Sequence, residues 1–143
     1  MRINQISVFL ENTKGRLFEV CSVLGQHKIN MRALTIAESQ DFGVLRIVVD
    51  KPAEAVKILK ENGFVTSLTD IVAVEVDDRP GGLAHILEVL SKEDINVEYM
   101  YGFVEKALEK ALLVFRFDDP DRAISTLTKN KIRVIKKEEI INL

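Results

Sequence analysis

Asn12-Thr13-Lys14-Gly15-Arg16-Leu17, near the amino terminus, returns in the second half of the chain as Asp78-Arg79-Pro80-Gly81-Gly82-Leu83. The offset of 66 residues that joins Gly15 to Gly81 also aligns Val23 with Val89, Leu24 with Leu90, Ile29 with Ile95 and Asn30 with Asn96. Self-similarity at a fixed period indicates repeated structural units. We therefore divide the 143 residues into two small modules, residues 1–69 and residues 70–143.

Composition and charge argue against several classes of function. The formal net charge is −2, from 20 basic and 22 acidic residues, so charge gives no reason to expect a nucleic acid or an anionic membrane as the main partner. The longest apolar runs, such as residues 111–115, are too short to span a bilayer, and no apolar signal peptide begins the chain. The single cysteine, Cys21, cannot form an internal disulfide. These features favour a soluble cytoplasmic protein.

The spacing of apolar residues predicts a strand and then a helix at the start of each module. Alternation with a period of two predicts the strands, at Ile6, Val8 and Leu10 and again at Val72, Val74 and Val76. After each glycine turn the spacing becomes i, i+3, i+4 and i+7, at Leu17, Val20, Cys21 and Leu24 and again at Leu83, Ile86, Leu87 and Leu90. We expect two amphipathic helices that turn these residues inward.

Two more strands, a helix and a last strand complete each module. The second strand should run from about Ile29 to Ala37, and the third carries Leu45, Ile47 and Val49. In the second module the offset grows to 68, at Leu113, Phe115 and Phe117, because the turn around residues 105–110 is two residues longer. Pro52 and Pro120 mark the starts of the second helices.

Each module therefore reads strand, helix, strand, strand, helix, strand. This is the ferredoxin-like βαββαβ order, an α+β fold in which both helices cover one face of an antiparallel sheet. Residues 64–76 contain neither proline nor glycine, so we expect the last strand of the first module to run directly into the first strand of the second.

The glycine turn and the Ile-Asn pair are the candidate ligand positions in each module. The turn leads into a helix amino terminus, whose free N–H groups can receive an anionic group. Helix capping is the alternative use of Asn12 and Asp78. Asn30 and Asn96 either satisfy a local turn or present an amide that accepts from an ammonium and donates to a carboxylate. Their duplication favours a binding site.

The residues around both turns resemble the ACT domain, a small regulatory module of amino-acid metabolism. The resemblance lies in residues 8–17 with Ile29-Asn30 and in residues 77–83 with Ile95-Asn96, and the two copies cover nearly the whole chain. It implies modules that pair side by side. A small ligand, usually an amino acid, then lies where the strand-to-helix loop of one module meets the second-strand start of its neighbour.

The resemblance also implies which residues bind the ligand. By position they are Asn12, Thr13, Lys14, Gly15, Arg16, Leu17 and Asn30 in the first module, and Asp78, Arg79, Gly81, Gly82, Leu83 and Asn96 in the second. Asn12 should then face the same cavity as Asn96, and Asp78 the same cavity as Asn30. The second module departs from the pattern, because Asp78 repels a ligand carboxylate and Pro80 lacks a backbone donor. The two sites should differ.

These observations predict a non-enzymatic amino-acid sensor that forms a homodimer and reports amino-acid supply to a partner such as a biosynthetic enzyme. We expect no catalytic residues, no metal and no cofactor, because the two histidines have no cysteine at ligand spacing and no nucleophile has a recognisable base. The alternative is a regulatory small subunit of a biosynthetic enzyme, since the first module also resembles the amino-terminal part of the small subunit of acetolactate synthase.

The carboxyl-terminal tail gives a further expectation. Residues 138–143 align, at the offset of 68, with residues 70–75, where a new first strand begins. We expect an extended tail that pairs with a sheet edge, because Ile140, Ile141 and Leu143 would otherwise be exposed. The alternative is a frayed end.

Overall fold

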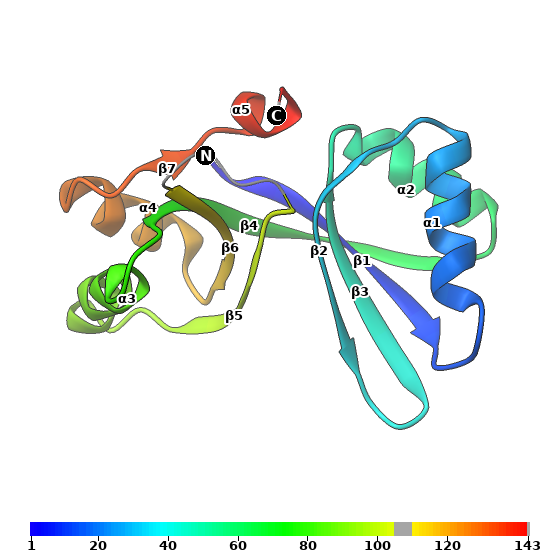
Figure 1. The fold of residues 1–143 in the computed structure, drawn as a ribbon, viewed down its shortest axis with the longest axis horizontal. Coiled ribbons are helices and arrows are strands. Elements are labelled where there is room, and N and C mark those ends of the chain that lie inside the picture. The colour runs from blue at the N-terminus through cyan, green and yellow to red at the C-terminus, as the bar shows by residue number, and fades with distance from the viewer. Residues whose placement is uncertain (105–109, 143) are drawn as a thin grey trace. The chain divides into compact units, whose positions relative to one another are not determined.

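The computed structural model describes residues 1–104 and 110–142, which form two compact units of the same topology (Figure 1). The first unit is Asn4–Thr69, and the second is Asp70–Leu143 together with Met1–Ile3. We call them the first and the second module. The longer turn expected around residues 105–110 lies mostly outside the described residues.

The first module has the expected order of elements. They are β1 (Ile3–Glu11), α1 (Arg16–Gln26), β2 (Met31–Glu38), β3 (Phe42–Val49), α2 (Pro52–Glu61) and β4 (Val65–Asp77). The strands lie in the order β2-β3-β1-β4, and β3 pairs antiparallel with both β1 and β2. Both helices begin where the sequence predicts, the second of them at Pro52.

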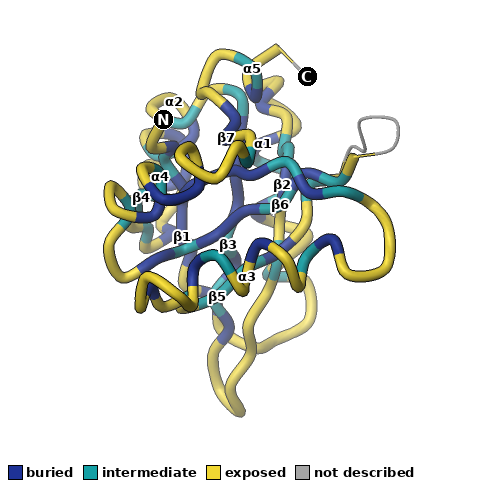
Figure 2. Tube along the Cα trace, turned by 90° about the vertical axis from the view of Figure 1, so that its left-hand side faces the viewer, coloured by how far each residue is buried: buried dark blue, intermediate teal, exposed yellow. Residues whose placement is uncertain are grey.

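The core of the first module lies between the two helices and one face of the sheet. Directly opposite residues such as Val8 and Leu45 share that face, since side chains of paired residues point the same way. Val20 and Leu24 of α1 and Leu59 of α2 are fully buried against it. In Figure 2 buried positions follow the strands, whereas exposed positions collect in the turns.

The second module repeats this arrangement. Its elements are β4, α3 (Gly82–Lys92), β5 (Val97–Gly102), β6 (Lys110–Phe117), α4 (Pro120–Lys129), β7 (Val134–Ile135) and α5 (Lys137–Ile141). β6 pairs antiparallel with β4 and β5, and β7 pairs with β4, so the order is β7-β4-β6-β5. The 13-residue strand β4 ends one module and begins the next, which confirms the direct connection.

Charged side chains attach the amino terminus to the second module. The Arg2 guanidinium donates to both carboxylate oxygens of Asp121, over 2.9 and 2.6 Å, and to Asp70 over 2.8 Å.

None of the described helices is both long and apolar enough to cross a membrane.

The buried stripe of the first helix in each module differs from the expectation. Leu17 is 42% exposed and Leu87 is 36% exposed, although the spacing predicts both inward. In α1 the residues that face the sheet are Val20, Val23 and Leu24. The buried face of α1 is therefore rotated about the helix axis relative to the predicted stripe, and Leu17 lies outside that face.

The prediction of an extended tail is wrong, because Lys137–Ile141 forms the short helix α5. The Glu139 carboxylate accepts from the Lys136 N–H over 3.1 Å and pairs with Arg133, which fixes the first turn of this helix. The signal that we missed is Glu139, three residues after the cap residue Lys136. Ile140 is 2% exposed, so α5 is packed and not frayed.

The burial of Ile140 gives a test of this packing. Ile140→Ala should lower the free energy of unfolding by about 2–5 kcal/mol, as other large-to-small core changes do. Ile141→Ala is the matched control, because Ile141 is 39% exposed and should cost far less. Urea denaturation of both variants measures the difference. Equal losses would show that α5 is not packed as described.

Candidate ligand-binding site

The turn before the first helix of each module is the same structure built twice. Thr13 N–H donates to Glu11 O over 2.8 Å, and Arg79 N–H donates to Asp77 O over 2.9 Å. Gly15 and Gly81 then start the helices with φ of 89° and 85°. This left-handed conformation favours glycine, so both glycines are required by the backbone.

Asn12 and Asp78 do not cap the helices. The residues at the cap positions are Gly15 and Gly81, and neither helix has a side-chain cap. Asn12 instead contacts the β2–β3 turn, with its N–H on Asp41 O at 2.9 Å and its side-chain amide 3.4 Å from Gln40 O. Asp78 is exposed. The capping alternative therefore fails at both positions.

Asn30 and Asn96 hold the start of the second strand through their main chains. Asn30 N–H donates to the Asp50 carboxylate over 3.0 Å, and Asn96 N–H donates to the Asp118 carboxylate over 3.1 Å. Asp50 and Asp118 return a backbone bond to the carbonyl of the same asparagine. These bonds use the main-chain N–H and C=O of each asparagine and not its side chain. The side chains of Asn30 and Asn96 stay exposed.

Sequence reasoning missed these two aspartates as part of the constellation. Each stands two residues before the proline that begins the second helix, in Asp50-Lys51-Pro52 and in Asp118-Asp119-Pro120. Their duplication was a visible signal.

The register of the sheet places the glycine turn and the asparagine of one module at opposite ends. Glu11 pairs with Phe42 at the start of β3, whereas Met31 pairs with Val49 at its end. At roughly 3.3 Å per residue, the eight residues of β3 separate Asn12 from Asn30 by about 23 Å.

The second module repeats this separation. Asp77 pairs with Lys110 and Val97 pairs with Phe117, at the two ends of β6. Neither module by itself can bring its glycine turn and its asparagine onto one small ligand.

The two modules carry different charges at equivalent positions. Lys110 pairs with Asp77 and, through its hydrogen bond and charge, lowers the pKa of that carboxyl. At the same place in the first module, Glu11 faces Phe42. Beside the asparagines, Lys28 is matched by Asp94, and both hold a left-handed backbone with φ of 57° and 55°.

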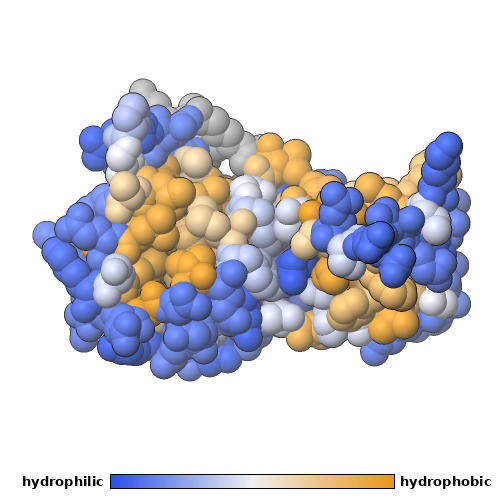
Figure 3. Space-filling model, turned by 90° about the horizontal axis from the view of Figure 1, so that it is seen from below, coloured by the Kyte–Doolittle hydropathy of each residue, from blue (hydrophilic) through white to orange (hydrophobic). Residues whose placement is uncertain are grey.

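The remaining predicted site residues lie on the glycine turns or in the first helical turn. Thr13 and Lys14 are exposed, and the Arg79 guanidinium lies 3.3 Å from the Asp77 carboxylate. Gly82 is buried, and Leu83 packs at the edge of the core. In Figure 3 apolar surface lies among charged residues in both modules.

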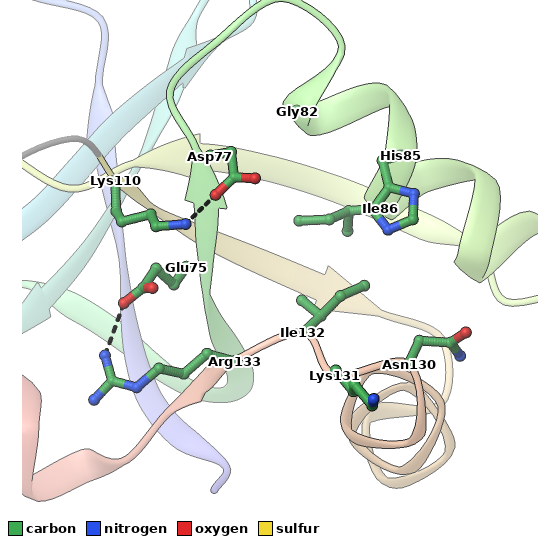
Figure 4. A pocket seen from close by; sticks show the side chains of 10 residues that line it. All are labelled: Glu75, Asp77, Gly82, His85, Ile86, Lys110, Asn130, Lys131, Ile132 and Arg133. Carbon is green, nitrogen blue, oxygen red and sulfur yellow. Dashed lines mark hydrogen bonds and ion pairs between the residues drawn. The ribbon is translucent and has the colours of Figure 1, made fainter.

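Two pockets lie within the second module. One of about 340 Å³ is lined by Asn96, with Leu87, Leu90, Ser91, Asp94, Ile95 and Val97. Apolar and polar groups both line it, and Asp94 and Asn96 lie just before the start of β5. The other, of about 240 Å³, lies at the end of β4 and is lined by charged residues and Gly82 (Figure 4).

A cluster of metal ligands is not apparent in the described part of the chain. Residues 1–104 and 110–142 hold no cluster of three or more His, Cys, Asp or Glu side chains that could bind a metal ion. Burial raises the pKa of the Cys21 thiol, which disfavours the reactive thiolate.

The glycines give an ordered set of stability changes. Gly81→Ala should cost about 1–2 kcal/mol, because alanine is strained at its positive φ. Gly82→Ala should cost more, because a Cβ there would lie 2.1 Å from Asp77 O. Gly25→Ala, inside α1 and with open space, should stabilise by about 0.5–1 kcal/mol. Thermal denaturation ranks the three, and any other order contradicts this backbone geometry.

Comparison with known proteins now identifies relatives. The sequence profile of the family described as ACT domain pair matches residues 1–143. None of the curated protein sequences gives a significant match. The crystal structure of protein BT0572 from Bacteroides thetaiotaomicron is 40% identical, with a TM-score of 0.94 over 100% of this chain and 98% of that one.

More distant structures share the fold. The ligand-free regulatory subunit of aspartate kinase from Thermus thermophilus has a TM-score of 0.65 at 16% identity, over 88% of this chain and 90% of that one. Aspartate kinase from Synechocystis has a TM-score of 0.55 at 17% identity, over 87% of this chain and 24% of that one.

Proposed function

The chain belongs to the ACT family, as an ACT domain pair, and we propose that it is a non-enzymatic regulatory protein that binds a free amino acid where two ACT modules meet. The observation that carries the proposal is the placement of the two candidate halves at opposite ends of each sheet. Both halves are present twice, yet each module needs a neighbour to complete a site.

An edge-to-edge arrangement of modules supplies what each module lacks. β2 and β5 are edge strands of their sheets. If one edge strand lies antiparallel to the edge strand of another module, the start of each lies beside the end of the other. The end of the second strand lies near the glycine turn of its own module, because Glu38 and Leu10 both pair with Gly43. Asn12 would then share a cavity with Asn96, and Asp78 with Asn30.

The charges of the two composite sites suit a zwitterion. The first combines Lys14 on the glycine turn with Asp94 beside the asparagine, and the second combines Asp78 with Lys28. With Arg16 and Arg79 on the same turns, each site therefore holds one acid and two bases. An α-carboxylate and an α-ammonium are recognised by such a set of charges with asparagine amides between them.

The pocket beside Asn96 offers room for the ligand side chain. Leu87, Leu90, Ile95 and Val97 line it together with Ser91 and Asp94, so it presents both apolar and polar contacts. Regulation follows because a ligand that bridges two modules stabilises only the arrangement in which both halves meet.

The second candidate is a regulatory subunit of an enzyme. It is supported by the fold shared with the regulatory subunit of aspartate kinase. A subunit of this kind would co-purify with its enzyme from native extract at constant stoichiometry, whereas a free sensor would elute alone or as a homodimer.

A thermal-shift screen of the twenty amino acids tests the binding. A ligand at a hundred times its dissociation constant should raise stability by about 2.7 kcal/mol. We expect a shift from at least one amino acid, and a complete absence of shifts would refute amino-acid binding. Analytical ultracentrifugation with and without the best ligand then tests whether occupancy changes the assembly.

Variants of the two glycine turns test which composite site is stronger. Asn12→Ala should weaken binding by about 1.5–3 kcal/mol, the value of a hydrogen bond to a charged group. Asp78→Ala should cost less, because it also removes a repulsion from the ligand carboxylate. Asn142→Ala, which removes an exposed amide from the terminal helix, is the control. Calorimetry that found equal losses for Asn12→Ala and Asp78→Ala would reverse this ranking.

A further inference from the structure

The charged pocket of the second module corresponds to a filled place in the first. At the offset of 66, Gly82 matches Arg16 and His85 matches Glu19, and at the offset of 68 Ile132 matches Phe64. Gly82, His85 and Ile132 all line the pocket at the end of β4. The duplication therefore allows the contents of one position to be compared within a single chain.

In the first module an arginine of the chain itself occupies this place. The Arg16 guanidinium lies 4.6 Å from the centre of the Phe64 ring, and its Nη1 donates to the Glu19 carboxylate over 2.7 Å. The side chain is largely covered. A cation held between an aromatic face and a carboxylate is a stable arrangement, so this position is closed.

In the second module the corresponding side chains are missing. Gly82 offers no side chain, and Ile132 is smaller than Phe64, which leaves a pocket of about 240 Å³. The turn is also tighter there, because Gly82 N–H donates to Arg79 O over 3.0 Å, against 3.4 Å for Arg16 and Thr13. A Cβ at Gly82 would collide with Asp77 O, so this tighter turn accepts only glycine.

The charge at these positions changes sign between the modules. The ten lining positions of the second module carry the acids Glu75 and Asp77 and the bases Lys110, Lys131 and Arg133. The matching positions of the first module carry the acids Glu11 and Glu19 and the single base Arg16. The first module thus closes an acidic position with its own cation, whereas the second leaves a position with one excess positive charge open.

Two of the cationic groups are held by acids, and the Asn130 amide donates to Thr126 O over 2.8 Å. Lys110 pairs with Asp77, and Arg133 pairs with Glu75 and Glu139. Within the described part of the chain, no hydrogen bond or ion pair joins Lys131 or His85 to another side chain. In Figure 4 the two acid–base pairs lie on one side of the pocket, His85 and Lys131 on the other, with Ile86 and Ile132 between them.

We propose that this pocket binds the oxyanion group, a carboxylate or a phosphate, of a small metabolite. Lys131 supplies a positive charge that is not paired with an acid in the described part of the chain. The ammonium of Lys110 and the guanidinium of Arg133 keep N–H donors beyond those that bond to their acids. The apolar floor of Ile86 and Ile132 accommodates a short carbon chain. The pocket lies wholly within the second module, and of the residues proposed for the amino-acid site it shares only Gly82.

Calorimetric titration of the full chain with inorganic phosphate, with succinate and with uncharged succinamide tests the proposal. We expect saturable binding, with one equivalent per chain, of phosphate or succinate or both, and none of succinamide. Binding of phosphate alone or succinate alone identifies the oxyanion. Failure of both anions to bind at millimolar concentration would overturn the proposal.

Variants locate the site. Lys131→Gly keeps the left-handed backbone, because Gly63 holds the same position in the first module, and should weaken anion binding about tenfold. Lys129→Ala removes an equal charge outside the pocket and should leave the affinity unchanged. Ile132→Phe, which restores the residue of the first module, should weaken succinate binding. Equal effects of Lys131→Gly and Lys129→Ala would assign the binding to general charge and overturn the site.

Discussion

The antiparallel register of the sheet is the constraint on which the proposed chemistry depends. In both modules the first strand ends beside the start of the third, and the second strand starts beside the end of the third. The glycine turn and the Ile-Asn pair therefore lie a full strand apart. No side-chain rotation closes a gap of about 23 Å, so a ligand that uses both features must use two modules. Under the proposed function, binding of such a ligand and the pairing of the modules would be a single equilibrium.

The two modules share the same backbone at the turns but carry side chains of different charge at equivalent positions. The turn hydrogen bonds at Thr13 and Arg79, the positive φ of Gly15 and Gly81, and the aspartate bonds to Asn30 and Asn96 recur almost unchanged. These features are set by the main chain and tolerate little variation. The side chains around them are free to differ, as Lys28 and Asp94 do. Two copies of one frame can thus hold sites of different chemistry.

The sequence predicted the order of elements because periodicity and turn residues are local signals. The strand alternation at Val72–Val76, the helix starts at Pro52 and Pro120, and the continuous strand β4 are all as expected. The rotation of α1 that exposes Leu17 depends on packing against the sheet, which spacing does not encode. The prediction of an extended tail was wrong for another reason. We gave the alignment with residues 70–75 more weight than the helix signal of Glu139. The distance between Asn12 and Asn30 follows from the pairing register of β3 with β1 and β2, which the sequence does not show.

Arg16 and Gly82 show how a closed position and an open one can arise from one ancestral turn. An arginine at this point fills its own module and fixes the helix start against Phe64. Glycine permits a tighter turn and gives up that contact, which removes a stabilising interaction from the fold. The lack of a side chain at Gly82 therefore leaves the pocket open, and its cationic lining is the reason that we propose an anionic ligand.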